Sequence, residues 1–178
     1  MSRLFVAVWL PPALTGRLRT LDRPARPGLR WTTEDQWHVT LRFLGETAPD
    51  LDLMGFLAAA AGGSDAVTAT LGPRPTALGD RVWVLPVDGL DGLAAGVLEA
   101  TRERVPVTGR RRFRGHVTLA RARRPGSLAG LPPAEVGGAW TVDTITLVCS
   151  HLHPDGARYE IIGTWPLRKE DRVGGQGG

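Results

Sequence analysis

The tetrapeptide His-Val-Thr-Leu occurs twice in this chain of 178 residues, at 38–41 and at 116–119. Each copy lies in a β-rich segment, and together the copies use two of the four histidines of the chain. Successive side chains of a strand point to opposite faces. We therefore predict that each copy directs His and Thr to one face of a sheet, and Val and Leu to a core on the other face.

The segments around the repeat predict a mixture of strands and helices that recurs in the second half of the chain. Strands are predicted at 4–10, 29–31, 38–43, 67–71, 81–87 and 113–122, helices at 11–21, 50–61 and 90–104, and a hairpin at 141–151 and 157–165. This order favours an α+β fold of two pseudo-symmetric lobes, each an antiparallel sheet with helices packed outside. Because no long linker separates the halves, we expect a single bilobal domain over residues 1–167. The charged, then Gly-rich, segment 168–178 is predicted to be a disordered tail.

Composition narrows the possible partners only a little. The chain is 42% hydrophobic, with a formal net charge of +4 and a pI of about 10.4, which permits an anionic partner without establishing one. Cys149 is the only cysteine, so an intramolecular disulfide and a zinc site built from several cysteines are excluded. The apolar N-terminal run ends at Pro11 and Pro12 and is too short to span a membrane. We expect a cytoplasmic protein with no membrane partner.

Two halves packed with their polar faces opposed would place His38, Thr40, His116 and Thr118 across one cleft. Two imidazoles can serve as general acid and general base near neutral pH. Hydroxyl groups can donate hydrogen bonds to phosphate oxygens where negative charge develops. Displacement at phosphorus by these groups needs neither a metal nor another cofactor. A duplicated fold can retain similar core strands without catalysis, but a repeated polar face requires a reason other than packing.

Arginines near the two tetrapeptides are candidates for binding phosphate. Regular alternation places Arg42 on the face of Thr40, and Arg112 and Arg114 on the face of His116. Guanidinium groups there could hold a phosphate or an RNA backbone. The alternative is that the run RRRFR at 110–114 is simply a solvated basic segment. Arg121 falls on the opposite face from His116 in a regular strand, so it is not predicted to belong to the site.

For two further sets of residues we predict a structural role, not a role in catalysis or binding. His151 and His153 are spaced to face one way on a strand and could chelate a metal, but no third ligand lies nearby in the sequence. We predict that they are structural or peripheral. Trp37 and Phe5 could stack on a base, but a place in the core is the simpler interpretation.

The paired motifs resemble the His-x-Thr-x signatures of the two-histidine (2H) phosphoesterases, and within them the LigT-like RNA 2',3'-cyclic phosphodiesterases. The segments that carry the resemblance are RLFVAVWLPP, RWTTEDQWHVTLRFLGE, FRGHVTLAR and SHLHPDGARYEIIGTWPL. The resemblance implies two α+β lobes with an active site in the cleft between them. One departure is Gly115, where relatives commonly carry proline. This change loosens the local backbone and keeps the chemical groups.

The resemblance implies a metal-independent hydrolase that opens the terminal 2',3'-cyclic phosphate of an RNA. The 3' oxygen leaves, and a 2'-phosphomonoester remains. By the same resemblance, His38 is the proton donor and His116 the proton acceptor, a choice that the symmetry of the motifs cannot make. The implied partners are RNA ends or oligonucleotides with a cyclic phosphate, and no obligate protein partner is implied. Two alternatives stay open: 2'-5' RNA ligation, and a non-catalytic RNA-binding module that uses the same cleft.

Overall fold

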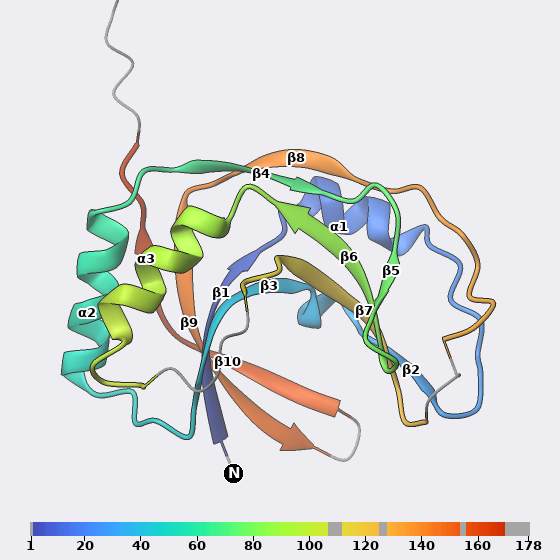
Figure 1. Ribbon diagram of the computed structural model, residues 1–178, viewed down its shortest axis with the longest axis horizontal. Helices are drawn as coiled ribbons and strands as arrows, with labels where there is room; N and C mark the ends of the chain where they lie inside the picture. The colour runs from blue at the N-terminus through green and yellow to red at the C-terminus, as the bar shows by residue number, and fades with distance from the viewer. Residues whose placement is uncertain (1, 107–111, 125–127, 154–155, 170–178) are drawn as a thin grey trace, which may run out of the picture.

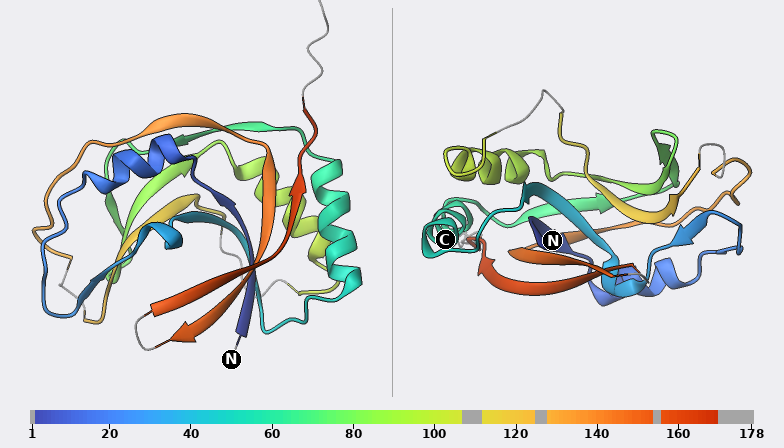
Figure 2. Two further views of the ribbon diagram at one scale, coloured as in Figure 1. Left: turned by 180° about the vertical axis from the view of Figure 1, so that it is seen from behind. Right: turned by 90° about the horizontal axis from the view of Figure 1, so that it is seen from below.

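The computed structural model describes residues 2–106, 112–124, 128–153 and 156–169. Within these residues the fold is α+β, as predicted: a curled antiparallel sheet of ten strands carries three α-helices (Figure 1). The helices α2 and α3 lie side by side at one end of the molecule, and α1 lies at the other end (Figure 2). No helix among the described residues is long and apolar enough to cross a membrane.

The sheet consists of two groups of four strands that meet at β3 and β7. The strands are β1 Ser2–Trp9, β2 Leu29–Trp31, β3 His38–Gly45, β4 Val67–Leu71, β5 Thr76–Leu78, β6 Val82–Asp88, β7 His116–Ala122, β8 Gly138–Val142, β9 Thr144–His153 and β10 Gly156–Pro166. Their order is β10-β9-β1-β3-β7-β6-β4-β8, with β2 beside β7 and β5 beside β6. The helices are α1 Pro12–Arg19, α2 Leu51–Gly62 and α3 Asp91–Thr101, together with a short 3₁₀ helix, η1 Glu34–Gln36.

The two groups of strands are joined by a single antiparallel pair, Val39 with Val117. Both valines are fully buried. Each is the second residue of its His-Val-Thr-Leu tetrapeptide, so the two copies of the repeat meet at the centre of the sheet. The four strands on either side of this pair make the predicted pseudo-symmetry visible in the strand order.

Local sequence signals account for the helix boundaries. Pro12 occupies the first turn of α1, where its missing N–H costs no hydrogen bond. Asp50 caps α2 by accepting a hydrogen bond from the Leu53 backbone N–H at 3.0 Å. Within α2 the buried side chains recur every four residues, at Leu53, Leu57 and Ala61, and this spacing turns one face of the helix toward the sheet.

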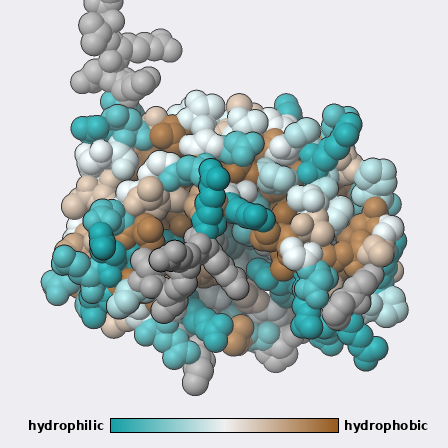
Figure 3. Space-filling model, in the orientation of Figure 1, coloured by the Kyte–Doolittle hydropathy of each residue, from teal (hydrophilic) through white to brown (hydrophobic). Residues whose placement is uncertain are grey.

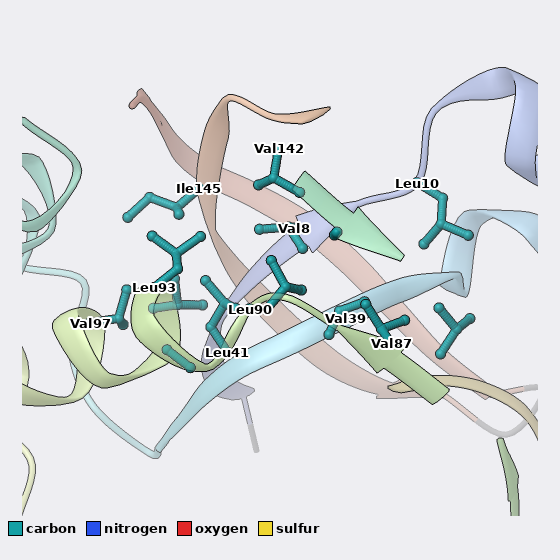
Figure 4. Packing of buried hydrophobic residues seen from close by; sticks show 14 of the residues in the cluster. Val8, Leu10, Val39, Leu41, Val87, Leu90, Leu93, Val97, Val142 and Ile145 are labelled. Carbon is teal, nitrogen blue, oxygen red and sulfur yellow. The ribbon is translucent and has the colours of Figure 1, made fainter. Parts of the chain in front are cut away.

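One hydrophobic core lies beneath both groups of strands. Val8 and Val39 from the first group pack in the same cluster as Val87 from the second, and α3 contributes Leu93 and Val97 (Figure 4). The two lobes therefore share their interior. They are not separate units that merely face each other across a cleft.

Most predicted elements are present, but several boundaries differ. The strand predicted at 113–122 begins only at His116, and the strand predicted at 141–151 is two strands, β8 and β9, separated at Asp143. The short elements η1 and β5 were not predicted.

Near the C-terminus, the described contacts extend to Arg168, the first residue of the predicted tail. This residue forms a β-bridge with Asp65, and its N–H donates to the Ser64 carbonyl at 2.9 Å. Disorder of the tail stays a prediction. Residues 170–178 lie outside the described residues.

Gly115 is tightly packed and does not loosen the chain before β7. Its carbonyl accepts a hydrogen bond of 2.9 Å from the Val87 N–H. A Cβ atom at this position would lie 2.3 Å from the Val87 carbonyl oxygen, which is closer than any real contact of this kind. Only glycine therefore lets β6 approach the residue that precedes His116.

Substitution of Gly115 should destabilise the protein. In Gly115→Ala the new methyl group must push β6 away from β7, and we expect the free energy of unfolding to fall by about 1–3 kcal/mol. The matched control is Gly55→Ala on α2, where an added Cβ has no neighbour within 4 Å. That variant should gain about 1 kcal/mol, because alanine is the better helix former. Urea denaturation of both variants is the measurement, and a Gly115→Ala protein as stable as wild type would contradict the close approach.

Candidate active site

A cleft of about 560 Å³ opens on the sheet face opposite the main core, and residues of β1, β2, β3, β7, β9 and β10 line it. The β9–β10 hairpin and the β2–β7 pair diverge from the centre of the sheet (Figure 1). Both groups of strands contribute to its walls. The side chains of the two tetrapeptides that line it are His38, Thr40, His116 and Thr118. The surface in the same orientation is a mixture of hydrophilic and apolar residues (Figure 3).

The predicted alternation within each tetrapeptide is confirmed. Val39, Leu41, Val117 and Leu119 are buried in the core, and the His and Thr side chains point into the cleft. The antiparallel pairing of Val39 with Val117 fixes how the four polar residues are arranged. On this register His38 lies across from Thr118, and His116 lies across from Thr40. The two imidazoles thus occupy opposite corners of one polar patch.

Directly after each tetrapeptide, the regular alternation breaks. Leu41 and Arg42 are buried in succession, as are Leu119 and Ala120. The pairing register shifts at the same places, between Val6 and Ala7 of β1 and between Trp83 and Val84 of β6. Irregularities of this kind insert an extra residue and reverse which face the following side chains take.

Two side chains return to the cleft because of these irregularities. Phe43 and Arg121 each stand five residues after the histidine of their tetrapeptide, and both line the cleft. Regular alternation had placed Arg121 on the opposite face, so the sequence interpretation missed it. The available signal was the equal spacing in HVTLRF and HVTLAR, which gives Phe43 and Arg121 equivalent positions.

Arg42 is part of the structure, and its predicted role in binding substrate is wrong. The residue is only 7% exposed. Its guanidinium donates hydrogen bonds to the Leu98 carbonyl at 2.6 Å, to Thr101 Oγ1 and to the Val105 carbonyl. The Leu98 carbonyl is one of the last four of α3, which have no partner within the helix. Arg42 therefore caps α3 and ties this helix to β3.

Arg112 and Arg114 are not brought into the cleft either. Both side chains are exposed, and neither is among the residues that line the cleft. The prediction required a strand that began at 113, but β7 begins at His116. The contribution of Arg114 is instead its backbone carbonyl, which lies 2.7 Å from His116 Nδ1.

Aromatic rings surround His38. Phe5 stacks on its imidazole at 4.8 Å between ring centroids, and Trp9 and Tyr159 meet it edge-on at 5.4 and 5.1 Å. The ring keeps some exposure to the cleft, although protein atoms make up most of its surroundings.

This environment favours the neutral form of the His38 ring. Burial lowers the pKa of His38 to about 4. The Gln36 backbone opposes this shift, and electrostatic interactions with Arg121 and His116 add to it. No hydrogen bond of good geometry joins His38 Nδ1 to any described residue. His38 therefore carries little positive charge at neutral pH.

His116 is held in a different way. A carbonyl oxygen can only accept a hydrogen bond, so the contact of Nδ1 with the Arg114 carbonyl requires that Nδ1 carries the proton. In the neutral ring the lone pair is then on Nε2. The two histidines have equivalent positions in the repeat and different surroundings.

Trp37 and Phe5 are buried, as predicted, but Phe5 and His153 also line the cleft. Trp37 is 2% exposed and donates from Nε1 to Thr32 Oγ1 at 3.1 Å, and Phe5 is 3% exposed beneath His38. His151 Nε2 lies 3.0 Å from Glu160 Oε2, and His153 borders the cleft. Among the described residues, no group of three or more His, Cys, Asp or Glu side chains is arranged to hold a metal ion.

Comparison with known proteins agrees with this geometry. The family described as LigT like Phosphoesterase matches residues 8–67. An RNA 2',3'-cyclic phosphodiesterase of Thermus thermophilus is 33% identical over 183 residues, which cover 94% of this chain and 91% of that protein.

Two solved structures share the whole fold. A crystal structure of a Thermus thermophilus protein has 30% identity and a TM-score of 0.79, and the match covers 94% of this chain and 99% of that one. A crystal structure of E. coli LigT complexed with 3'-AMP has 28% identity and a TM-score of 0.74, with 93% and 98% covered. The chain belongs to the LigT-like phosphoesterases of the 2H superfamily.

The cap that Arg42 forms on α3 predicts a stability phenotype. Arg42→Met removes the guanidinium and leaves buried acceptors unpaired, so the free energy of unfolding should fall by about 2–4 kcal/mol. Arg121→Met, at the exposed position in the cleft, should change it by less than about 0.5 kcal/mol. Chemical denaturation of the two variants checks this, and equal stability would reject the structural role of Arg42.

The enclosure of His38 predicts a loss of stability in acid. The pKa of His38 is about 4 in the folded chain against 6.5 for an exposed imidazole, so the unfolded chain binds the proton more readily between these values. Stability from this residue is complete above pH 6.5 and falls as the pH decreases toward 4. The expected loss between pH 7 and pH 4.5 is about 2–3 kcal/mol.

His38→Gln should show a smaller acid-induced loss than wild type, by about this amount. His151→Gln, at an exposed histidine, should lose as much as wild type. Urea denaturation at the two pH values measures both losses. The proposed enclosure is refuted if His38→Gln and wild type lose equal stability.

Proposed function

We propose that this protein is a metal-independent RNA 2',3'-cyclic phosphodiesterase that leaves a 2'-phosphomonoester. The observation that carries the proposal is the pair of His-Thr sets that the Val39–Val117 pairing gathers on one face of the sheet, in a cleft lined by arginines. The name of the Thermus relative, RNA 2',3'-cyclic phosphodiesterase, supports the same reaction. The 3'-AMP in the E. coli LigT structure fits a site for nucleotides in this family.

In the proposed reaction the cyclic phosphate lies between the two imidazoles. His116 Nε2 accepts a proton from water while the water oxygen forms a bond to phosphorus. The bond from phosphorus to the ribose 3' oxygen breaks, and this oxygen takes a proton from His38. Thr40, Thr118 and Arg121 donate hydrogen bonds to the non-bridging oxygens, where negative charge increases in the transition state. Exchange of protons with solvent restores both histidines.

The surroundings of the two histidines help to decide which one acts as the general acid and which as the general base. The proton that His116 Nδ1 donates to the Arg114 carbonyl leaves Nε2 ready to accept, which supports His116 as the base. The pKa of His38, about 4, means that this residue is neutral before substrate binds. An anionic phosphate beside the ring raises its pKa, because an opposite charge favours the protonated form. We therefore propose that His38 becomes an effective donor only in the complex with substrate.

Phe43 is the residue best placed to hold the terminal base. Its side chain is 71% exposed at the edge of the cleft. Phe5, the neighbouring aromatic residue, already stacks on His38 and has no free face of comparable size. A base stacked on an exposed aromatic ring contributes about 1–3 kcal/mol whatever its identity. We infer that Phe43 contributes affinity without strong base selectivity.

Two other functions use the same cleft. Ligation through a 2'-5' linkage would employ the same acid and base with an RNA hydroxyl in place of water. A binding module would hold the RNA end without turnover. The full set of His-Thr pairs in the cleft favours catalysis over binding alone. A cytoplasmic location remains a prediction of the sequence.

The decisive assay follows an oligonucleotide that ends in a 2',3'-cyclic phosphate, in the presence of EDTA. Wild type should release a 2'-phosphomonoester, identified against 2'- and 3'-phosphate standards. His38→Ala and His116→Ala should each reduce turnover about 10²–10⁴-fold, because each removes one proton transfer. His151→Ala, outside the cleft, should stay within about twofold of wild type.

The pH dependence of the residual activity separates the two roles. In His38→Ala the remaining base predicts activity that rises with pH, and in His116→Ala the remaining acid predicts activity that falls with pH. The opposite pattern would exchange the roles. Loss of all activity in EDTA would reject the mechanism, and binding without product would favour the binding module.

A further inference from the structure

The cleft holds more positive charge than a terminal cyclic phosphate requires. Four arginines line it, Arg3, Arg30, Arg121 and Arg123, and no aspartate or glutamate is among the lining residues described. A cyclic phosphodiester carries a single negative charge. Arg121 lies on the same strand as His116 and Thr118 and serves that charge. The positive charge beyond Arg121 suits a further phosphate of a longer strand.

Strand β1 arranges the cleft residues in a row that leads away from the histidines. Its pairing with β3 sets Trp9 beside His38, Ala7 beside Thr40 and Phe5 beside Phe43. Arg3 follows on the same face, one side-chain repeat or about 7 Å beyond Phe5. Arg3 thus lies next to the position of the terminal base, on the side away from the reacting phosphate.

Strand β9 extends this row with groups that suit a nucleotide. Ser150 pairs directly with Arg3 and also lines the cleft. Leu152 stands two residues further on the same face and is 70% exposed, which is unusual for a large apolar side chain inside a cleft. A guanidinium, a hydroxyl and an apolar surface follow one another outward from Phe43.

The side chain of Arg3 is available for a ligand. It is exposed, and no hydrogen bond or ion pair joins it to the residues that the structure describes. Arg30 differs, because it has another interaction and its guanidinium packs against Gly156. Arg123 lies just past the end of β7, on the opposite arm of the cleft.

The geometry points to a second subsite, for the penultimate nucleotide of the RNA. Arg3 and Ser150 bind the phosphate that links the last two nucleotides, and Leu152 supports the penultimate base. The strand leaves the active site over β1 and β9. This assignment rests on the proposed function, and it makes an RNA of at least two nucleotides the preferred substrate over a single nucleoside cyclic phosphate.

The test compares a nucleoside 2',3'-cyclic phosphate with a dinucleotide that ends in the same group. Wild type should have the higher kcat/KM for the dinucleotide. Arg3→Ala should lower kcat/KM for the dinucleotide about 10- to 100-fold, the effect of one lost hydrogen bond to a charged group, and leave the mononucleotide unchanged. Arg158→Ala, at an exposed arginine of β10 that does not line the cleft, is the matched control and should change kcat/KM for neither substrate. Arg123→Ala tests the opposite arm of the cleft and should show no selective loss for the dinucleotide.

The affinities of two product-like ligands, a nucleoside 2'-monophosphate and a dinucleotide with a 2'-phosphate, separate this subsite from the proposed function. Weaker binding of the dinucleotide alone in Arg3→Ala supports the subsite even if wild type hydrolyses neither substrate. If Arg3→Ala weakens the binding of both ligands equally, or of neither, the subsite is overturned. In that case hydrolysis by the wild-type protein would still support the proposed function. If Arg123→Ala, and not Arg3→Ala, selectively weakens binding of the dinucleotide, the RNA leaves the site over β7. This result would also overturn the subsite at Arg3.

Discussion

A single antiparallel contact, Val39 with Val117, joins the two halves of the sheet and determines where the site forms. Both side chains are completely buried in the shared core, so burial of apolar surface holds the junction together. Because neighbours in a strand face opposite ways, burying these two valines turns the adjacent His and Thr side chains into the cleft. Core packing and the assembly of the candidate site are therefore consequences of the same pair of residues.

The irregularities that follow each tetrapeptide extend this arrangement. By placing two buried residues in succession, they send Arg42 into the core and bring Phe43 and Arg121 into the cleft. Arg42 then caps α3, which stabilises the strand that carries His38. Equivalent positions in the repeat hold an aromatic ring, Phe43, in one half and a guanidinium, Arg121, in the other. The proposed substrate has both a base and a phosphate.

The pseudo-symmetry of the strands does not extend to the chemistry of the histidines. His38 is enclosed by aromatic rings that lower its pKa, whereas His116 is oriented by a backbone carbonyl. The roles proposed for the two histidines require one ring to be protonated while the other is neutral, and their different surroundings make the two rings inequivalent before substrate binds. The supporting residues around each imidazole break the symmetry that the duplicated strands create.

The sequence by itself determined the α+β class, nearly all the strands and the facing of each His-Thr pair, because strand alternation is a local property. It could not determine the place of Arg42 or Arg121. The shift of alternation after Leu41 and Leu119 arises from pairing with β1 and β6, and these partners are distant in the chain. The enclosure of His38 likewise needs Phe5 and Tyr159, which only the tertiary structure brings to it.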